Sequence, residues 1–103
     1  MQIPIQITLH GIGPSDALHN DIRERAEKLA RFYDRITSCR VVLEMDGLHK
    51  RNGNQYRAHI DLKVPGGEIA VTQAHDEDLK VALRDAFDAV RRKLEVYARA
   101  QRG

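Results

Sequence analysis

The chain has 103 residues, of which 42% are hydrophobic and 31% are charged, and this is the size and composition of one ordinary globular domain. No apolar run approaches the roughly 18 residues of a membrane helix, and the first residues lack the basic and apolar regions of a signal peptide. The single cysteine excludes an internal disulfide. We therefore expect one cytoplasmic domain over residues 1–103 that does not contact a membrane. The net charge of +2 does not by itself indicate a nucleic-acid partner.

The first third of the chain predicts a strand and then a helix. The first ten residues alternate between apolar and polar side chains, as in a strand with one buried face. Pro4 lacks an amide donor, which favours an edge position in the sheet. Ser15 is a good N-cap, and Asp16 suits the positive end of the helix dipole. Apolar residues then recur at steps of three and four, which predicts a helix over residues 16–33, with either Phe32 or Tyr33 closing its apolar face.

Three more strands and a second helix follow. The segments SCRVVLEMD, QYRAHIDLKV and EIAVTQ predict strands at residues 38–46, 55–64 and 68–73. Cys39 lies in the first of them, where we expect it to be an apolar structural residue. Pro65 and Gly66 suit the central positions of a type II turn, which makes VPGGEI a hairpin turn. An acid among Asp76, Glu77 and Asp78 should cap the last helix, whose apolar stripe begins at Leu79 and extends to about residue 100.

The element order β-α-β-β-β-α predicts an α+β fold, a two-layer sandwich in which both helices pack on one face of a four-stranded sheet. The last three strands form a hairpin meander, and we expect no parallel strand–helix–strand unit. The other sheet face should be open and should display Arg40, Arg57, His59, Lys63 and Thr72.

No motif indicates catalysis, a metal or a cofactor. Gly66 and Gly67 are followed by a predicted strand, and no lysine comes directly after them. A P-loop needs the motif G-x-x-x-x-G-K-[ST] before a helix. Gly11 and Gly13 lie between a strand and a helix, but Asp16 replaces the third glycine of the dinucleotide fingerprint and would repel a pyrophosphate. The histidines share no metal-ligand spacing. An enzyme is therefore the last of the functions that we consider.

Basic residues gather on the helix flanks. Residues 80–103 contain seven basic and three acidic side chains. A structural explanation is sufficient for this pattern, because the macrodipole favours bases near a helix C-terminus and because Glu24–Lys28 and Glu27–Arg31 are i,i+4 pairs. An RNA surface would require bases from both helices to converge, which the sequence does not show.

Several stretches resemble the ribosome hibernation-promoting factor family, which includes the ribosome-associated inhibitor and is also labelled sigma-54 modulation protein. They are ALHNDIRERAEKLARFYDRITSCRVVLE, HIDLKVPGGEI and HDEDLKVALRDAFDAVRRKLE. Within them the most specific parts are Lys28-Leu29, residues 33–36, residues 64–69, and Asp78-Leu79 with Ala82 and Leu83. The resemblance covers nearly the whole chain and is one of fold and pattern.

The resemblance implies the same fold and a translation inhibitor that acts in stress. Such a protein binds the small ribosomal subunit, contacts ribosomal RNA through basic helix residues, and blocks the channel for messenger and transfer RNA by steric exclusion. Together with the charge pattern it selects these candidate RNA-binding residues: Arg25, Lys28, Arg31, Arg35, Lys80, Arg84, Arg91 and Arg92. The chain departs from the family pattern at Lys80, where an aromatic is common, and at Ala89, Val96 and Ala98, where lysines are common.

Two alternatives remain open. The first is a general RNA-binding module that uses the open sheet face or the hairpin loop, and the second is a regulator that binds another protein. We expect the free chain to be monomeric and to lack the C-terminal dimerisation domain of long family members.

Overall fold

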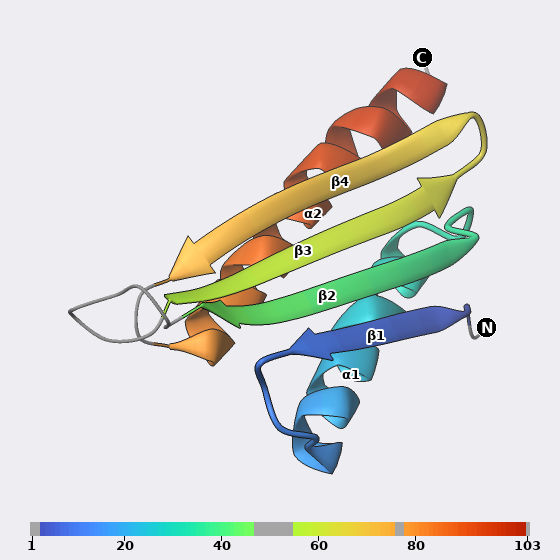
Figure 1. Ribbon diagram of the computed structural model, residues 1–103. Helices are drawn as coiled ribbons and strands as arrows, with labels where there is room; N and C mark the ends of the chain where they lie inside the picture. Colours follow the sequence, from blue (N-terminus) through green and yellow to red (C-terminus); the bar gives the residue numbers. More distant parts are fainter. Residues whose placement is uncertain (1–2, 47–54, 76–77, 103) are drawn as a thin grey trace.

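The computed structural model describes residues 3–46, 55–75 and 78–102. Its elements are β1 (Ile5–His10), α1 (Asp16–Phe32), β2 (Ser38–Asp46), β3 (Gln55–Val64), β4 (Gly67–His75) and α2 (Leu79–Arg102). Figure 1 shows one sheet with both helices on the same face, so the predicted two-layer α+β fold is confirmed. The last strand and the last helix both extend beyond their predicted ends.

The strands lie in the order β1-β2-β3-β4, and β2, β3 and β4 form the predicted antiparallel meander. As Pro4 indicated, β1 is an edge strand. It is parallel to β2, with Ile5 opposite Cys39, so the expectation that the chain has no parallel strand–helix–strand unit was wrong. The reason is that α1 returns along the sheet, and the strand that follows it runs in the direction of β1.

The loop between β1 and α1 serves the packing of the fold and does not form a phosphate site, although it lies between a strand and a helix of a parallel unit. Gly11 has a φ of 71°, and a Cβ there would lie 2.9 Å from the carbonyl oxygen of Met45. The Ser15 hydroxyl accepts a hydrogen bond from the Leu18 amide at 3.2 Å, so the predicted cap is confirmed. The first glycine therefore serves a close backbone approach, and a side chain already occupies a helix N-terminus that a phosphate would need.

The β3–β4 hairpin has a two-residue turn between Val64 and Gly67, which are paired in the ladder. Gly66 adopts a φ of 86°, the positive value that a type II turn requires at its second central position. The Tyr97 hydroxyl donates a hydrogen bond to the Pro65 carbonyl at 2.5 Å. This contact attaches the turn to α2, and the turn interpretation of VPGGEI is confirmed.

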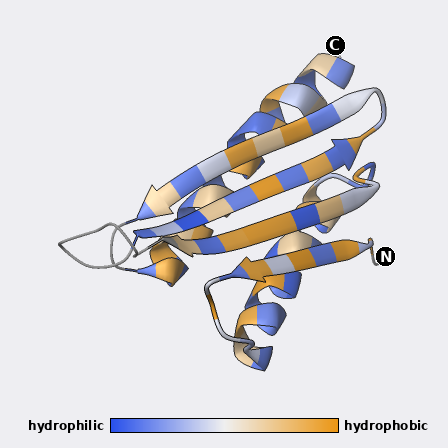
Figure 2. Cartoon of the chain, viewed as in Figure 1, coloured by the Kyte–Doolittle hydropathy of each residue, from blue (hydrophilic) through white to orange (hydrophobic). Residues whose placement is uncertain are grey.

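The core lies between the sheet and the helices. Figure 2 shows apolar and polar residues alternating along the strands, and on β3 the inward residues Ala58, Ile60 and Leu62 are completely buried. Other fully buried side chains come from the neighbouring elements: Ile22, Val41, Leu43, Leu83, Val90 and Leu94. In the described part of the chain, neither helix has the length and hydropathy needed to span a membrane.

Replacing Ile60 by alanine should lower the free energy of unfolding by about 2–5 kcal/mol, because it leaves a cavity at the centre of the core. The control is Val96→Ala, since Val96 is 63% exposed and its truncation should cost less than about 0.5 kcal/mol. Urea unfolding of both variants measures the difference. Equal losses would contradict the position of Ile60 in the core.

The thiol of Cys39 should be unreactive in the folded protein. Burial, and then the negative charge of Asp61, raise its pKa to about 12, so at pH 8 only about one thiol in ten thousand is ionised. A disulfide reagent at this pH should therefore label the native protein very slowly and the unfolded protein at once. Rapid labelling without unfolding would contradict the structural role of Cys39.

Candidate nucleic-acid interface

A groove separates the two helices on their solvent side. Its lining, which we call the interhelical groove, consists of Asp21, Glu24, Arg25, Lys28, Leu29, Phe87, Asp88 and Arg91. Leu29 and Phe87 are each 5% exposed, so they belong to the core, and the rest of the lining is charged. Three of the predicted RNA-binding residues, Arg25, Lys28 and Arg91, therefore come together here from two different helices. This is the convergence that the sequence could not show.

The cations of α1 differ in whether an acid neutralises them. Arg25 donates to Asp21, with 2.9 Å between Nε and Oδ1. The expected i,i+4 ion pairs of Lys28 and Arg31 are absent, because neither side chain lies within 4.0 Å of an acid among the residues that the structure describes. Lys28 and Arg31, which are exposed, therefore keep charge that can attract an anion.

Arg91 reaches from α2 to the end of α1. Its guanidinium carbon lies 5.1 Å from the centre of the Phe32 ring, which is within the range of a cation–π contact. Its Nε lies 3.5 Å from Oε1 of Glu95. The two contacts hold the guanidinium beside an aromatic ring that is itself 46% exposed.

The structure also decides which aromatic residue ends the apolar face of α1. The Tyr33 ring packs edge-to-face on Tyr97, with 5.9 Å between the ring centres, and it lies against the core. Phe32 instead points away from the core and remains 46% exposed to solvent. Sequence reasoning therefore missed Phe32 as a surface residue, although the adjacency of two aromatics at a helix end implied that only one could face inward.

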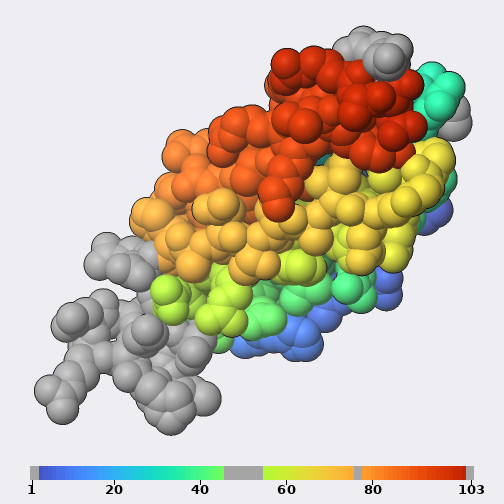
Figure 3. Space-filling model, turned by 90° about the horizontal axis from the view of Figure 1, so that it is seen from above, coloured from blue at the N-terminus to red at the C-terminus, as the bar shows by residue number. Residues whose placement is uncertain are grey.

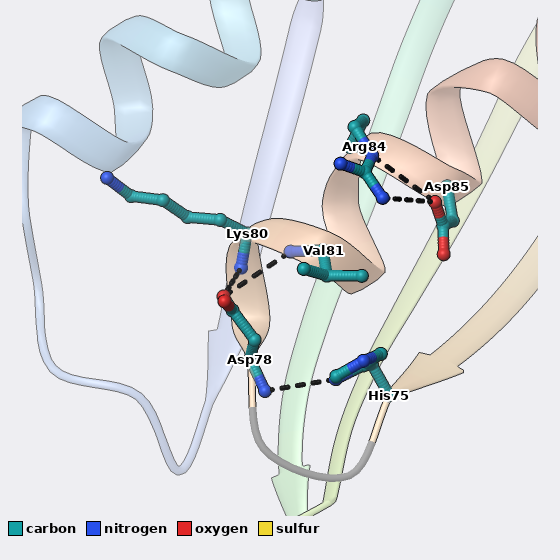
Figure 4. A network of polar contacts seen from close by, with 6 residues as sticks. All are labelled: His75, Asp78, Lys80, Val81, Arg84 and Asp85. Carbon is teal, nitrogen blue, oxygen red and sulfur yellow. Dashed lines mark hydrogen bonds and ion pairs between the residues drawn. The ribbon is translucent and has the colours of Figure 1, made fainter.

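Asp78 caps α2 at the other end of the groove (Figure 4). Its Oδ1 accepts hydrogen bonds from the amides of Lys80 at 2.9 Å and Val81 at 3.4 Å. Its own amide donates to Nδ1 of His75 at 3.2 Å. The prediction of an acidic cap is thus confirmed for Asp78, and the other two acids, Asp76 and Glu77, lie outside the described residues.

Lys80 and Arg84, two further predicted residues, lie in an acidic part of this surface. The Lys80 side chain extends toward α1 in Figure 4 and lines a hollow with Asp21, Glu24 and Asp78. Arg84 lies against its neighbour, with 3.4 Å between Nη2 and Oδ1 of Asp85. Both cations therefore have negative charge close by, which reduces their attraction for phosphate.

The helices run in the same direction. Ser15 and Asp78, which lie at the two N-termini, line one hollow, whereas Tyr33 and Gln101, near the two C-termini, line another. Both helices carry exposed cations toward their C-termini, and we call this set the basic end: Lys28, Arg31, Arg35, Arg91, Arg92 and Arg99. Of these, Lys28 and Arg91 line the interhelical groove, and Arg35 lines the hollow near the two C-termini.

The basic end contains five of the predicted residues and adds Arg99, which was not a candidate. Apart from Arg91, none of its members forms an ion pair with a residue in the described ranges. Arg35 also borders the hollow beside Phe32. The remaining three candidates, Arg25, Lys80 and Arg84, lie toward the acidic end.

The open sheet face contains cations that are already paired. Each lies next to an acid of the neighbouring strand: Arg40 to Asp61 at 3.7 Å, Arg57 to Glu44 at 3.3 Å and Lys63 to Glu68 at 2.6 Å. The last contact is a hydrogen bond that raises the pKa of Lys63 and lowers that of Glu68. The charges of these three cations are therefore neutralised by their acidic partners, and this face is less suited to bind a polyanion than the basic end.

The family model for the sigma 54 modulation protein / S30EA ribosomal protein matches residues 5–102. The chain belongs to this family. Its match with the "Ribosome hibernation promoting factor" of Azotobacter vinelandii is 30% identical over 90 residues, which is 87% of this chain and 78% of that protein. The "Ribosome hibernation promotion factor" of Deinococcus radiodurans is 29% identical over 97 residues, or 94% of this chain. The chain spans about half of that relative, 49% of its length.

The fold is shared with the N-terminal domain of Protein Y from Thermus thermophilus. The two structures superimpose with a TM-score of 0.76 at 26% identity, over 94% of this chain and 99% of the other. The two structures thus share the sheet and the pair of helices on which the interhelical groove depends.

The Asp21→Asn variant should bind a heparin column more tightly than the wild type, because it removes a negative charge from the groove and frees Arg25. Glu44→Gln is the matched control, since it also removes one carboxylate that pairs with an arginine but does so on the open sheet face. We expect a higher eluting salt concentration for Asp21→Asn than for Glu44→Gln. The reverse order would identify the sheet face as the polyanion surface.

Proposed function

We propose that this chain is a ribosome-associated hibernation factor that inhibits translation by binding the small ribosomal subunit. Its family and the names of its relatives support a ribosomal role. The structural observation that supports an RNA contact is the basic end. There Lys28 of α1 and Arg91 of α2 line the same groove, and every cation except Arg91 lacks an acidic partner among the described residues. The proposed partner of this surface is the phosphate backbone of ribosomal RNA.

The proposed mechanism involves attachment and exclusion, with no covalent chemistry. Each cation that neutralises a phosphate releases counterions, which favours binding and makes it salt-dependent. The 24 residues of α2 correspond to about 36 Å of helix. This length can follow an RNA groove while the sheet behind it fills space. A body seated in the channel for messenger and transfer RNA would exclude both, and it needs neither a metal nor a cofactor to do so.

The alternative of RNA binding through the open sheet face has less support, because its cations Arg40, Arg57 and Lys63 already have acidic partners. The loop over residues 47–54, the other surface considered for RNA, lies outside the described residues. A regulator that binds a protein would not require the basic end, and charge removal there would leave its partner bound.

The test is co-sedimentation with isolated small ribosomal subunits at several salt concentrations. Replacing Lys28 and Arg91 together by glutamine should weaken binding by about tenfold or more and should lower the slope of log affinity against log salt by about 2. The reason is that the variant loses two phosphate contacts. Messenger RNA with initiator transfer RNA should displace the wild type.

The matched control is the double variant Arg57→Gln with Lys63→Gln, which removes the same charge from the sheet face. It should bind as the wild type does. If the control loses affinity and the groove variant does not, the proposed face is wrong. If the wild type fails to sediment with subunits at low salt, the ribosomal role is wrong.

A further inference from the structure

Phe32 is an exposed aromatic ring within the basic end. Large exposed side chains that stand singly on a surface are ordinary, and Val96, at 63% exposure, is one of them. Phe32 differs in its surroundings. The Arg91 guanidinium lies over its ring, and the hollow beside it is lined by Tyr33, Arg35, Ala98 and Gln101.

Cations surround this ring along the chain as well as across the groove. Lys28 lies one helical turn before Phe32 on the same side of α1, is exposed, and lacks an acidic partner among the described residues. Arg35 lines the same hollow as Phe32. A nucleotide placed on the ring would therefore have positive charge on several sides for its phosphate.

The contact with Arg91 preorganises the ring. Phe32 is the last residue of α1, where a side chain would otherwise be free to change rotamer, and Arg91 is itself held by Glu95 at 3.5 Å. The neighbouring Tyr33 fixes the helix end on Tyr97. A ring restricted in this way loses less entropy when a base stacks on it than a freely rotating ring would.

From this arrangement we infer that Phe32 stacks on an unpaired base of the bound RNA and that Arg91 holds the ring in position. The inference rests on the proposed function and deepens it, because it assigns a base contact in addition to the phosphate contacts. A phenylalanine ring forms no hydrogen bond to a base, so it can stack on any of the four bases once that base lies outside an RNA helix. It selects for a single-stranded or bulged nucleotide over a duplex, because bases stacked inside a duplex present no free face.

The experiment compares Phe32→Leu, which keeps an apolar side chain without a π-system, with Phe32→Tyr, which keeps the ring. Phe32→Leu should weaken binding to isolated small subunits by about 5- to 150-fold, the usual range for one lost stack. Phe32→Tyr and Val96→Ala should bind as the wild type does. Thermal unfolding of all variants should agree closely, since the Phe32 ring is exposed.

Ultraviolet crosslinking at zero length adds a readout that affinity cannot give. The wild type should crosslink to RNA within the tryptic peptide of residues 32–35, and Phe32→Leu should lose this crosslink although Tyr33 remains in the peptide. Equal affinity of Phe32→Leu and the wild type, or a crosslink that persists in Phe32→Leu, would overturn the inference.

A second probe separates this inference from the proposed function. The same crosslinking is performed with a single-stranded adenosine oligonucleotide. A crosslink at Phe32 to the oligonucleotide, without any binding to subunits, would support the stack and refute the ribosomal role. Binding to subunits without a crosslink at Phe32 would leave the ribosomal role standing and overturn the stack. If neither RNA binds, both are overturned.

Discussion

The burial of one face of the sheet beneath both helices is the constraint on which the rest of the structure depends. The fully buried residues of β3, at the sheet's centre, meet apolar stripes from α1 and α2. Because both helices must cover the same face, they lie next to each other, and their outer flanks form the walls of the interhelical groove. Figure 3 shows the outer surface of α2 alongside β4, on the side away from α1.

The parallel pairing of β1 and β2 sets the direction of α1 and so determines the character of the groove. Each helix carries bases toward its C-terminus and an acidic cap or first turn at its N-terminus, as the macrodipole favours. If the helices were antiparallel, the two charge gradients would cancel along the groove. They run in the same direction, so the gradients add. The result is an acidic end around Asp78 and a basic end toward the two helix C-termini, while the groove between them is lined by three acids and three bases.

Ion pairing then distinguishes the two faces of the molecule. The sheet brings oppositely charged residues of adjacent strands to nearly opposite positions, and cross-strand pairs form there. On the helices, Lys28 and Arg31 have glutamates at i,i+4 spacing and yet remain unpaired among the described residues. The two surfaces therefore differ in their capacity to attract phosphate, because the cations of the sheet face are paired and most of those at the basic end are not.

The sequence by itself determined the local features. The Ser15 cap, the turn at Gly66 and the apolar faces of the helices each depend on interactions between residues a few positions apart, and these were predicted correctly. The edge position of β1 was predicted from the missing amide donor of a single residue, Pro4. The resemblance to the hibernation-promoting factor family also followed from residues read in order. In the candidate site, the residue types and the helices that carry them were predictable.

Only the tertiary structure decided how these features combine. The parallel β1–β2 pairing joins residues more than thirty positions apart, which periodicity cannot indicate. The same pairing decides that Lys28 and Arg91 share one groove. It also decides which cations have acidic partners and that Phe32, rather than Tyr33, is exposed beside Arg91. The charge pattern along one helix shows toward which end and on which side of that helix the bases lie. Which residues face them across the groove depends on how the whole sheet is assembled.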